Sequence, residues 1–82
     1  KNYARKIKGE KMITIYSKNN CPQCKMTKRL LDQRGVSYQE INLDEQPEYT
    51  EQVKELGYKA APVVVYDGGH FSGFKPDLLR KL

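Results

Sequence analysis

The alternation of apolar and polar residues places four short strands along the chain. Residues 12–16 and 36–43 alternate with the two-residue period of a half-buried strand. Residues 62–66 form an apolar run of the kind found in strands that are buried on both faces. An Asp-Gly-Gly turn at 67–69 is typical of a hairpin and leads into a short fourth strand at 70–72.

Three further segments have the apolar spacing and the end signals of helices. Residues 22–35 begin with a proline and end with a glycine, which are typical first and last signals of a helix. In residues 44–57, Asp44 and Pro47 introduce a second helix that Gly57 closes, and residues 76–82 carry a last short helix. The element order is therefore βαβαββα, with a parallel first pair of strands and an antiparallel hairpin. This order predicts an α/β fold, a four-stranded mixed sheet flanked by three helices that cover both faces.

The two cysteines of the chain stand at the start of the first predicted helix. Cys21 and Cys24 are three residues apart and directly follow the first strand and a polar turn. Helical geometry puts their Cα atoms roughly 5 Å apart, inside the range of about 4.4–6.8 Å over which a disulfide forms. The pair can thus cycle between dithiol and disulfide, and beside a βαβ pattern it indicates a thioredoxin-like redox centre. With the element order, it predicts a minimal thioredoxin/glutaredoxin fold.

Other roles for the cysteine pair have less support. A zinc site needs four protein ligands, or three and a water, and the chain adds only His70 to the two cysteines. We therefore expect no metal. A structural disulfide that closes a two-residue loop would stabilise the fold little. Two unrelated buried cysteines remain an alternative, but the preceding strand and the following helix favour redox chemistry.

Length and composition predict one small domain in the cytoplasm. The chain has 82 residues, with no apolar run long enough to span a membrane and no signal-peptide pattern. A secreted domain of this size would be expected to carry several disulfides. We therefore expect a cytoplasmic monomer with no membrane partner.

The positive charge is concentrated at one end of the sequence. Residues 1–11 contain five Lys or Arg and one Glu, whereas residues 12–82 contain ten Lys or Arg and nine Asp or Glu. We expect residues 1–11 to be a basic extension, a leader or a non-native segment, and residues 12–82 to be the redoxin domain. A module that binds nucleic acid or an acidic partner through this extension is a rival hypothesis. The near-neutral domain argues against it, so no nucleic-acid partner is expected.

The placement of the two sulfurs predicts different roles for them. A thiolate is the attacking species, and a helix N-terminus lowers the pKa of a thiol. Cys21 lies at that end, with Lys18 and Lys25 nearby in sequence, and is expected to attack a partner disulfide. A plain solvated loop lysine is the alternative for Lys18. Cys24, one turn further along, is expected to be buried and to resolve the mixed disulfide.

Two other segments are candidates for contact with a partner. The loop at Ala61 and Pro62 precedes the third strand and is expected to lie against the helix that carries the cysteines. A cis Ala61–Pro62 peptide would turn the Ala61 backbone toward an extended peptide. We also expect an exposed apolar surface near the cysteines at Phe71 and Phe74, with Phe71 as the surface residue. Phe74 is expected to pack mainly in the core.

Three segments of the sequence resemble the NrdH-redoxins, the glutaredoxin-like proteins that serve class Ib ribonucleotide reductase. They are residues 15–24, residues 61–64 and residues 71–77, and the resemblance extends over residues 12–82. The third segment, Phe-Ser-Gly-Phe-Lys-Pro-Asp, looks like the family's Trp-Ser-Gly-Phe-Arg-Pro-Asp signature. Gln23 matches a motif position at which ordinary glutaredoxins usually have Tyr.

The sequence departs from the family at three positions. Phe71 replaces the Trp and therefore lacks the indole N–H, and Lys75 replaces the Arg and lacks its guanidinium fork. Pro22 is shared with glutaredoxins, whereas the NrdH-redoxins more often have Val or Met. Hydrogen bonds that the Trp and the Arg support in relatives are therefore not expected in the same form here.

The resemblance implies a protein-disulfide oxidoreductase that carries electrons between other proteins. It implies a redox-active Cys21–Cys24 disulfide and no bound cofactor. Electrons would come from NADPH through a flavin-containing thioredoxin reductase and pass to the large subunit of class Ib ribonucleotide reductase. The residues expected to contact these partners are Lys18, Pro22, Gln23, Ala61, Pro62, Phe71, Ser72, Gly73 and Phe74.

A glutathione-dependent glutaredoxin is the alternative function. Glutaredoxins commonly hold the amino group of glutathione with an acidic residue at the start of the last helix. The sequence has Lys75 in that region, and a cation there disfavours a glutathione site.

Overall fold

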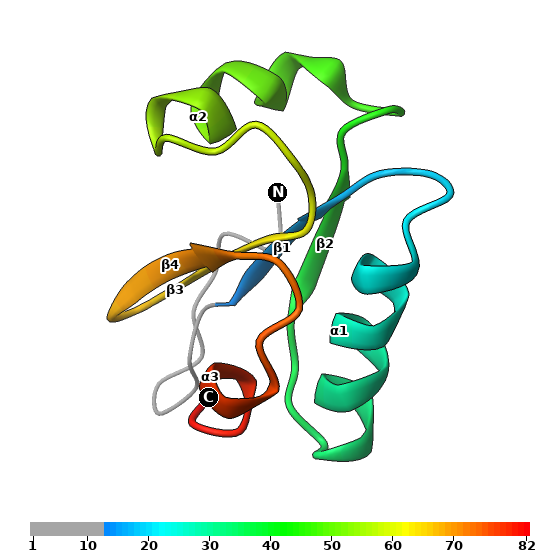
Figure 1. Ribbon diagram of the computed structural model, residues 1–82, viewed down its shortest axis with the longest axis vertical. Coiled ribbons are helices and arrows are strands. Elements are labelled where there is room, and N and C mark those ends of the chain that lie inside the picture. Colours follow the sequence, from blue (N-terminus) through cyan, green and yellow to red (C-terminus); the bar gives the residue numbers. More distant parts are fainter. Residues whose placement is uncertain (1–12) are drawn as a thin grey trace.

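The computed structural model describes residues 13–82, and the predictions for the basic extension and for Met12 lie outside this range. The described elements follow the predicted βαβαββα order (Figure 1). In chain order they are β1 (Thr14–Ser17), α1 (Pro22–Gln33), β2 (Gln39–Asn42), the 3-10 helix η2 (Pro47–Tyr49), α2 (Thr50–Glu55), β3 (Val63–Tyr66), β4 (Gly69–Ser72) and α3 (Pro76–Leu79).

The strands form one mixed sheet in the order β2-β1-β3-β4. Strand β1 pairs in parallel with β2 and antiparallel with β3, and β3 pairs antiparallel with β4. The register places Ile15 opposite Val64, and Val64 opposite Phe71. The predicted parallel pair and hairpin are therefore confirmed.

Apolar residues pack on both faces of this sheet. On one face, Ile15 packs with Leu31 of α1 and Leu79 of α3. On the other face, the adjacent residue Tyr16 packs in a cluster that includes Val53 of α2. Figure 1 shows the same division, with α2 on one side of the sheet and α1 and α3 on the other. This arrangement confirms that helices cover both faces.

Several elements, including α1, β2, α2 and α3, are shorter than the sequence predicts. Helix α1 ends at Gln33. Gly35, two residues further on, has a φ of +70°, a left-handed conformation that glycine adopts easily, and the Val36 N–H bonds to the Leu31 carbonyl over 3.0 Å. Residues 36–38 were predicted to begin the second strand, but they connect the helix to β2. Helix α3 ends at Leu79, and the N–H groups of Lys81 and Leu82 beyond it bond three residues back rather than four.

Candidate redox site

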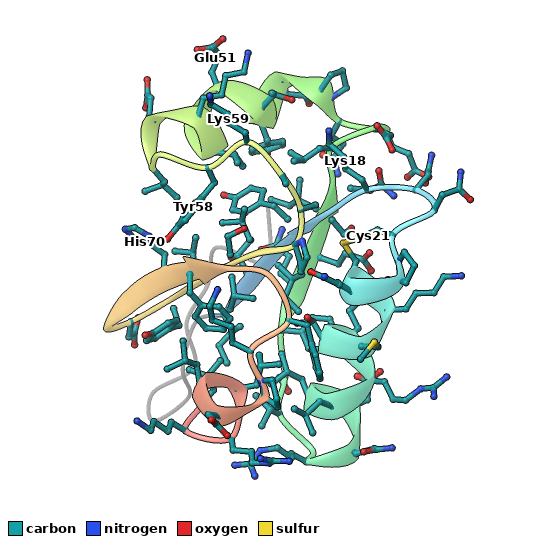
Figure 2. All side chains as sticks on the ribbon, in the orientation of Figure 1. Lys18, Cys21, Glu51, Tyr58, Lys59 and His70 are labelled. Atoms are coloured by element: carbon teal, nitrogen blue, oxygen red, sulfur yellow. A yellow bond between two sulfur atoms is a disulfide. The ribbon has the colours of Figure 1, made fainter. Side chains whose placement is uncertain are left out.

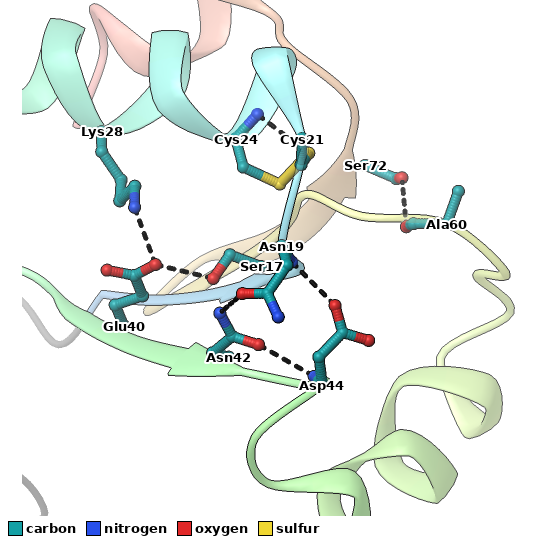
Figure 3. The surroundings of a disulfide bond; sticks show 10 residues. All are labelled: Ser17, Asn19, Cys21, Cys24, Lys28, Glu40, Asn42, Asp44, Ala60 and Ser72. Atoms are coloured by element: carbon teal, nitrogen blue, oxygen red, sulfur yellow. Dashed lines mark hydrogen bonds and ion pairs between the residues drawn. A yellow bond between two sulfur atoms is a disulfide. The ribbon is translucent and has the colours of Figure 1, made fainter.

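A disulfide joins Cys21 and Cys24 at the start of α1. Their Cα atoms are 5.2 Å apart, which agrees with the separation expected from helical spacing. Cys21 is the N-cap of α1 and has an extended backbone, and Pro22 occupies the first helical position, where its missing N–H is no loss. The local sequence thus places one sulfur just outside the helix and the other in its first turn (Figure 3).

The two sulfurs lie in different environments. Cys24 is 2 % exposed, whereas Cys21 is half-buried. The backbone N–H of Cys24 donates a hydrogen bond of 3.1 Å to the sulfur of Cys21 (Figure 3). The first turn of α1 contains no acidic residue, so no carboxylate in that turn reduces the positive potential at the N-terminus of the helix. When the disulfide opens, this end of the helix stabilises a thiolate on Cys21, the sulfur that a partner can reach.

A groove of about 610 Å³ runs beside the disulfide. It brings together two segments that are far apart in the sequence, the loop that ends at Cys21 and the loop that precedes β3. The described residues that line it are Lys18, Asn19, Asn20, Cys21, Pro22, Gln23, Lys59, Ala60 and Ala61. Four predicted contact residues therefore line one groove: Lys18, Pro22, Gln23 and Ala61.

Lys59 also lines this groove and was not among the predicted contact residues. It lies two residues before Ala61, so the prediction for the Ala61–Pro62 loop was a signal that could have found it. Lys18 and Lys59 are both exposed, and the groove lining contains no Asp or Glu. Both lysines and Cys21 are labelled in Figure 2. The groove thus offers two cations to a partner and no opposing carboxylate.

The Ala61–Pro62 peptide is cis, and the side chain of Pro62 is buried. Pro62 was expected to contact a partner, but burial keeps its ring from doing so, and its neighbour Ala61 lines the groove instead. The Pro62 carbonyl accepts a hydrogen bond of 2.8 Å from the Gly73 N–H. The hydroxyl of Ser72 donates to the Ala60 carbonyl over 3.3 Å. These bonds attach the predicted contact residues Ser72 and Gly73 to the loop that forms the groove.

The prediction that Phe71 lies on an exposed apolar surface is wrong. Phe71 is 6 % exposed and packs in the same core cluster as Ile15. The reason is the strand alternation in β4, where Phe71 lies opposite the buried Val64 while its neighbour His70 is exposed. Phe74 is half-buried and packs against the same cluster, as expected.

Lys75, which departs from the family signature, folds back over the segment that contains it. Its ammonium group donates to the carbonyl of Ser72 and lies 5.9 Å from the centre of the Phe71 ring. Gly73 adopts a φ of +88°, and a Cβ added there would lie 3.5 Å from the Lys75 nitrogen and 3.8 Å from the Gln23 side-chain oxygen. Gln23, Gly73 and Lys75 are therefore close together beside the cysteine helix.

A cluster of polar side chains links β1, α1 and β2 (Figure 3). The buried hydroxyl of Ser17 donates to Glu40 over 2.7 Å, and the Lys28 ammonium bonds to the same carboxylate oxygen at 2.8 Å. Burial, the largest single effect, raises the pKa of Glu40, but the bonds from Lys28 and Ser17 together outweigh it and hold the pKa below its ordinary value. No sequence pattern predicts this cluster, because its members are distant in the chain.

The described residues contain no other candidate redox or metal centre. Among residues 13–82, no three His, Cys, Asp or Glu side chains gather where they could hold a metal ion. The single histidine, His70, bonds through Nδ1 to the Tyr58 hydroxyl at 2.7 Å (Figure 2). In the same part of the chain, no helix has the length and apolar character needed to cross a membrane.

The mixed sheet, its covering helices and the disulfide at the start of α1 define a small redox protein of the thioredoxin-fold class. The family model described as glutaredoxin matches residues 13–71. The glutaredoxin-like protein NrdH of Lactococcus lactis subsp. cremoris is 55% identical over 71 residues, which span 87% of this chain and 99% of that protein. NrdH of Escherichia coli is 41% identical over 70 residues, 85% of this chain and 86% of the relative.

A solved structure gives the same result. The NrdH-redoxin of Escherichia coli, a glutaredoxin-like protein with a thioredoxin-like activity profile, superimposes with a TM-score of 0.83 at 41% identity. The match covers 87% of this chain and 93% of that one. The chain therefore belongs to the glutaredoxin family and, within it, to the glutaredoxin-like NrdH proteins.

Proposed function

We propose that this protein is the dithiol electron carrier for class Ib ribonucleotide reductase. It reduces a disulfide of the large subunit and is itself re-reduced by a flavin-containing thioredoxin reductase at the expense of NADPH. The observation that carries the proposal is the 55% identity to a glutaredoxin-like NrdH protein over nearly its full length. The thioredoxin-like activity profile of the E. coli relative supports thioredoxin reductase as the electron donor.

The proposed reaction is a two-step thiol–disulfide exchange. The Cys21 thiolate attacks one sulfur of the client disulfide, the client S–S bond breaks, and the departing client thiolate takes up a proton. Cys24 then loses its proton and attacks the Cys21 sulfur, which releases the second client thiol and forms the Cys21–Cys24 disulfide. Two electrons and two protons pass to the client in each cycle, and thioredoxin reductase restores the dithiol.

The groove beside the disulfide is the proposed docking site for the client segment. An extended chain laid along Ala60 and Ala61 would bring its disulfide to Cys21 and could pair with backbone groups of that loop. Lys18 and Lys59, with no carboxylate between them in the lining, favour a client segment that carries negative charge. Pro22 and Gln23 also line the groove. Ser72 and Gly73 bond to the loop that forms it, and with Phe74 they are proposed to contact the client from the neighbouring segment.

A glutathione-dependent glutaredoxin is the second candidate function. The glutaredoxin family match favours it, as does the 36% identity to glutaredoxin 3 of E. coli over 62 residues. The cation of Lys75 at the start of α3 argues against it, because the amino group of glutathione would meet a like charge there.

We place the protein in the cytoplasm and propose that it acts as a monomer.

The test is a reconstituted class Ib ribonucleotide reductase assay. NADPH, thioredoxin reductase and this protein should together support deoxyribonucleotide formation, and omission of this protein or the Cys21→Ser change should abolish it. Dithiothreitol in place of the reducing system is the control that the reductase itself is active. Turnover that does not depend on this protein would contradict the proposal.

A further inference from the structure

The loop before Cys21 determines where the attacking sulfur lies. Residues 18–20 connect β1 to the N-cap of α1, and all three are exposed to solvent. Asn20 has a φ of +54°, a left-handed conformation that asparagine tolerates better than most residues. An exposed loop of this kind is held only by the polar contacts that it makes.

Two hydrogen bonds fasten this loop to Asn42, the last residue of β2, and to Asp44 just beyond it (Figure 3). The backbone N–H of Asn19 donates to the Asp44 carboxylate over 2.8 Å, and the Asn42 side-chain amide donates to the Asn19 side-chain oxygen over 3.0 Å. The side-chain oxygen of Asn42 also accepts from the N–H groups of Asp44 and Glu45, over 2.9 and 3.2 Å. Both ends of the Asn42 amide are therefore bonded.

The anchor of this network belongs to the sheet. Asn42 is the last residue of β2 and lies opposite Ser17, the last residue of β1. The Leu43 N–H donates to the Ser17 carbonyl over 2.7 Å, so the two strand ends are joined directly. Asn19 is thus held at two points to a part of the molecule that the disulfide does not touch.

We propose that Asn42 and Asp44 are positioning residues that hold the Cys21 sulfur at the N-terminus of α1 when the disulfide is open. In the oxidised protein the bond to Cys24 fixes this sulfur. In the dithiol, Cys21 is held on its helix side by the bond from the Lys25 N–H to its carbonyl, over 3.1 Å, and on its other side by the loop and its network. A Cys21 thiolate that stays at the N-cap keeps the hydrogen bond from the Cys24 N–H and the favourable helix dipole. A loosened loop loses both, and the thiolate becomes less stable.

This inference rests on redox cycling of the cysteine pair and not on which client is reduced. The assay therefore uses the full chain in its reduced form with iodoacetamide at pH 7, and peptide mapping assigns the modified cysteine. No ribonucleotide reductase or thioredoxin reductase is present, so failure of the proposed function and failure of this inference give separate results. Asn42→Ala and Asp44→Ala should each slow alkylation of Cys21 about two- to fivefold, the range expected from a weakened helix-terminus interaction.

The Asp44→Asn variant distinguishes positioning of the loop from the electrostatic effect of the Asp44 carboxylate. It keeps an oxygen that can accept from the Asn19 N–H but removes the negative charge, and it should react at close to the wild-type rate. If Asp44 acted only through its charge, its removal would lower the pKa of the Cys21 thiol, and both Asp44 variants would react faster than wild type. Faster reaction of Asp44→Ala would therefore overturn the proposal.

Two further variants complete the experiment. Tyr58→Phe removes one surface hydrogen bond, to His70, away from the loop, and should leave alkylation unchanged. Asn19→Ala removes only the side-chain link to Asn42 and should give an intermediate slowing, which keeps the test decisive if Asn42→Ala does not fold. Wild-type alkylation rates in Asn19→Ala and in Asp44→Ala would show that the network does not position Cys21.

Discussion

The backbone N–H of Cys24 donates a hydrogen bond of 3.1 Å to the sulfur of Cys21, so one cysteine caps the helix that buries the other. The two sulfurs cannot exchange roles without moving the start of α1. This relationship makes the two cysteines structurally inequivalent. We therefore expect Cys21 to attack the partner disulfide and Cys24 to act only after a mixed disulfide has formed.

The first prediction concerns the order in which the cysteines react. A small alkylating agent at neutral pH should modify Cys21 of the reduced protein before Cys24, because Cys24 is 2 % exposed. Cys24→Ser should accumulate mixed disulfides with a client, and Cys21→Ser should form none. Peptide mapping by mass spectrometry distinguishes the two sulfurs. Modification of Cys24 first would reverse the proposed roles.

The burial of Phe71 predicts a large loss of stability when it is truncated. Phe71→Ala should lower the free energy of unfolding by about 3–5 kcal/mol, the range for a buried aromatic side chain. Phe74→Ala should cost less, because Phe74 is only half-buried. Urea unfolding of both variants checks this, with Phe71→Leu as the control that retains apolar volume. An unfolding midpoint of Phe71→Ala close to that of wild type would contradict the observed packing.

The Lys28–Glu40 contact predicts a pH-dependent contribution to stability. Because the pKa of Glu40 is lowered in the folded protein, its stabilising effect is present above the ordinary carboxyl pKa and is lost as the pH falls through the lowered value. Lys28→Ala should cost about 1 kcal/mol or less at neutral pH, since the pair is partly exposed. The difference from wild type should narrow in acid.

Unfolding free energies measured between neutral pH and pH 3 test this. The control is Arg80→Ala, which removes the more exposed pair with Asp77 and should change stability little at any pH. A Lys28→Ala effect that stays constant over the same pH range would show that loss of packing, and not the ionised carboxylate, accounts for it.

Deletion of residues 1–11 should leave activity and stability nearly unchanged. The sequence of this segment has no apolar periodicity with which it could dock on the domain. The thermal midpoint and the rate of disulfide reduction of the truncated and full chains provide the measurement. A midpoint lower by many degrees after truncation would show that the extension packs on the domain.

The element order and the disulfide could be predicted from the sequence because their signals are local. Pro22 and Gly35 mark the ends of α1, and the cysteine spacing alone gives the Cα separation that the structure has. The face occupied by Phe71 could not be predicted in this way. A four-residue strand beside a turn allows either phase of alternation, and only the pairing of Phe71 with Val64 across β3 and β4 decides which side is buried.

The polar contacts around the site also could not be predicted from local sequence patterns. The bonds from Asn19 to Asn42 and Asp44 join residues that are 23 and 25 positions apart, and the bond from Ser17 to Glu40 spans 23 positions. These contacts exist because β1 and β2 are parallel neighbours whose carboxyl ends meet at the same edge of the sheet. Lys59 enters the groove for a similar reason, since the loop before β3 lies beside the start of α1.

The proposed electron donor can be tested directly by comparing two reducing systems on this protein with a small disulfide substrate. One contains NADPH and thioredoxin reductase, and the other contains NADPH, glutathione and glutathione reductase. We predict that NADPH oxidation in the first system rises in proportion to the concentration of this protein, and that the second system shows no such dependence. Faster turnover with glutathione than with thioredoxin reductase would contradict the account.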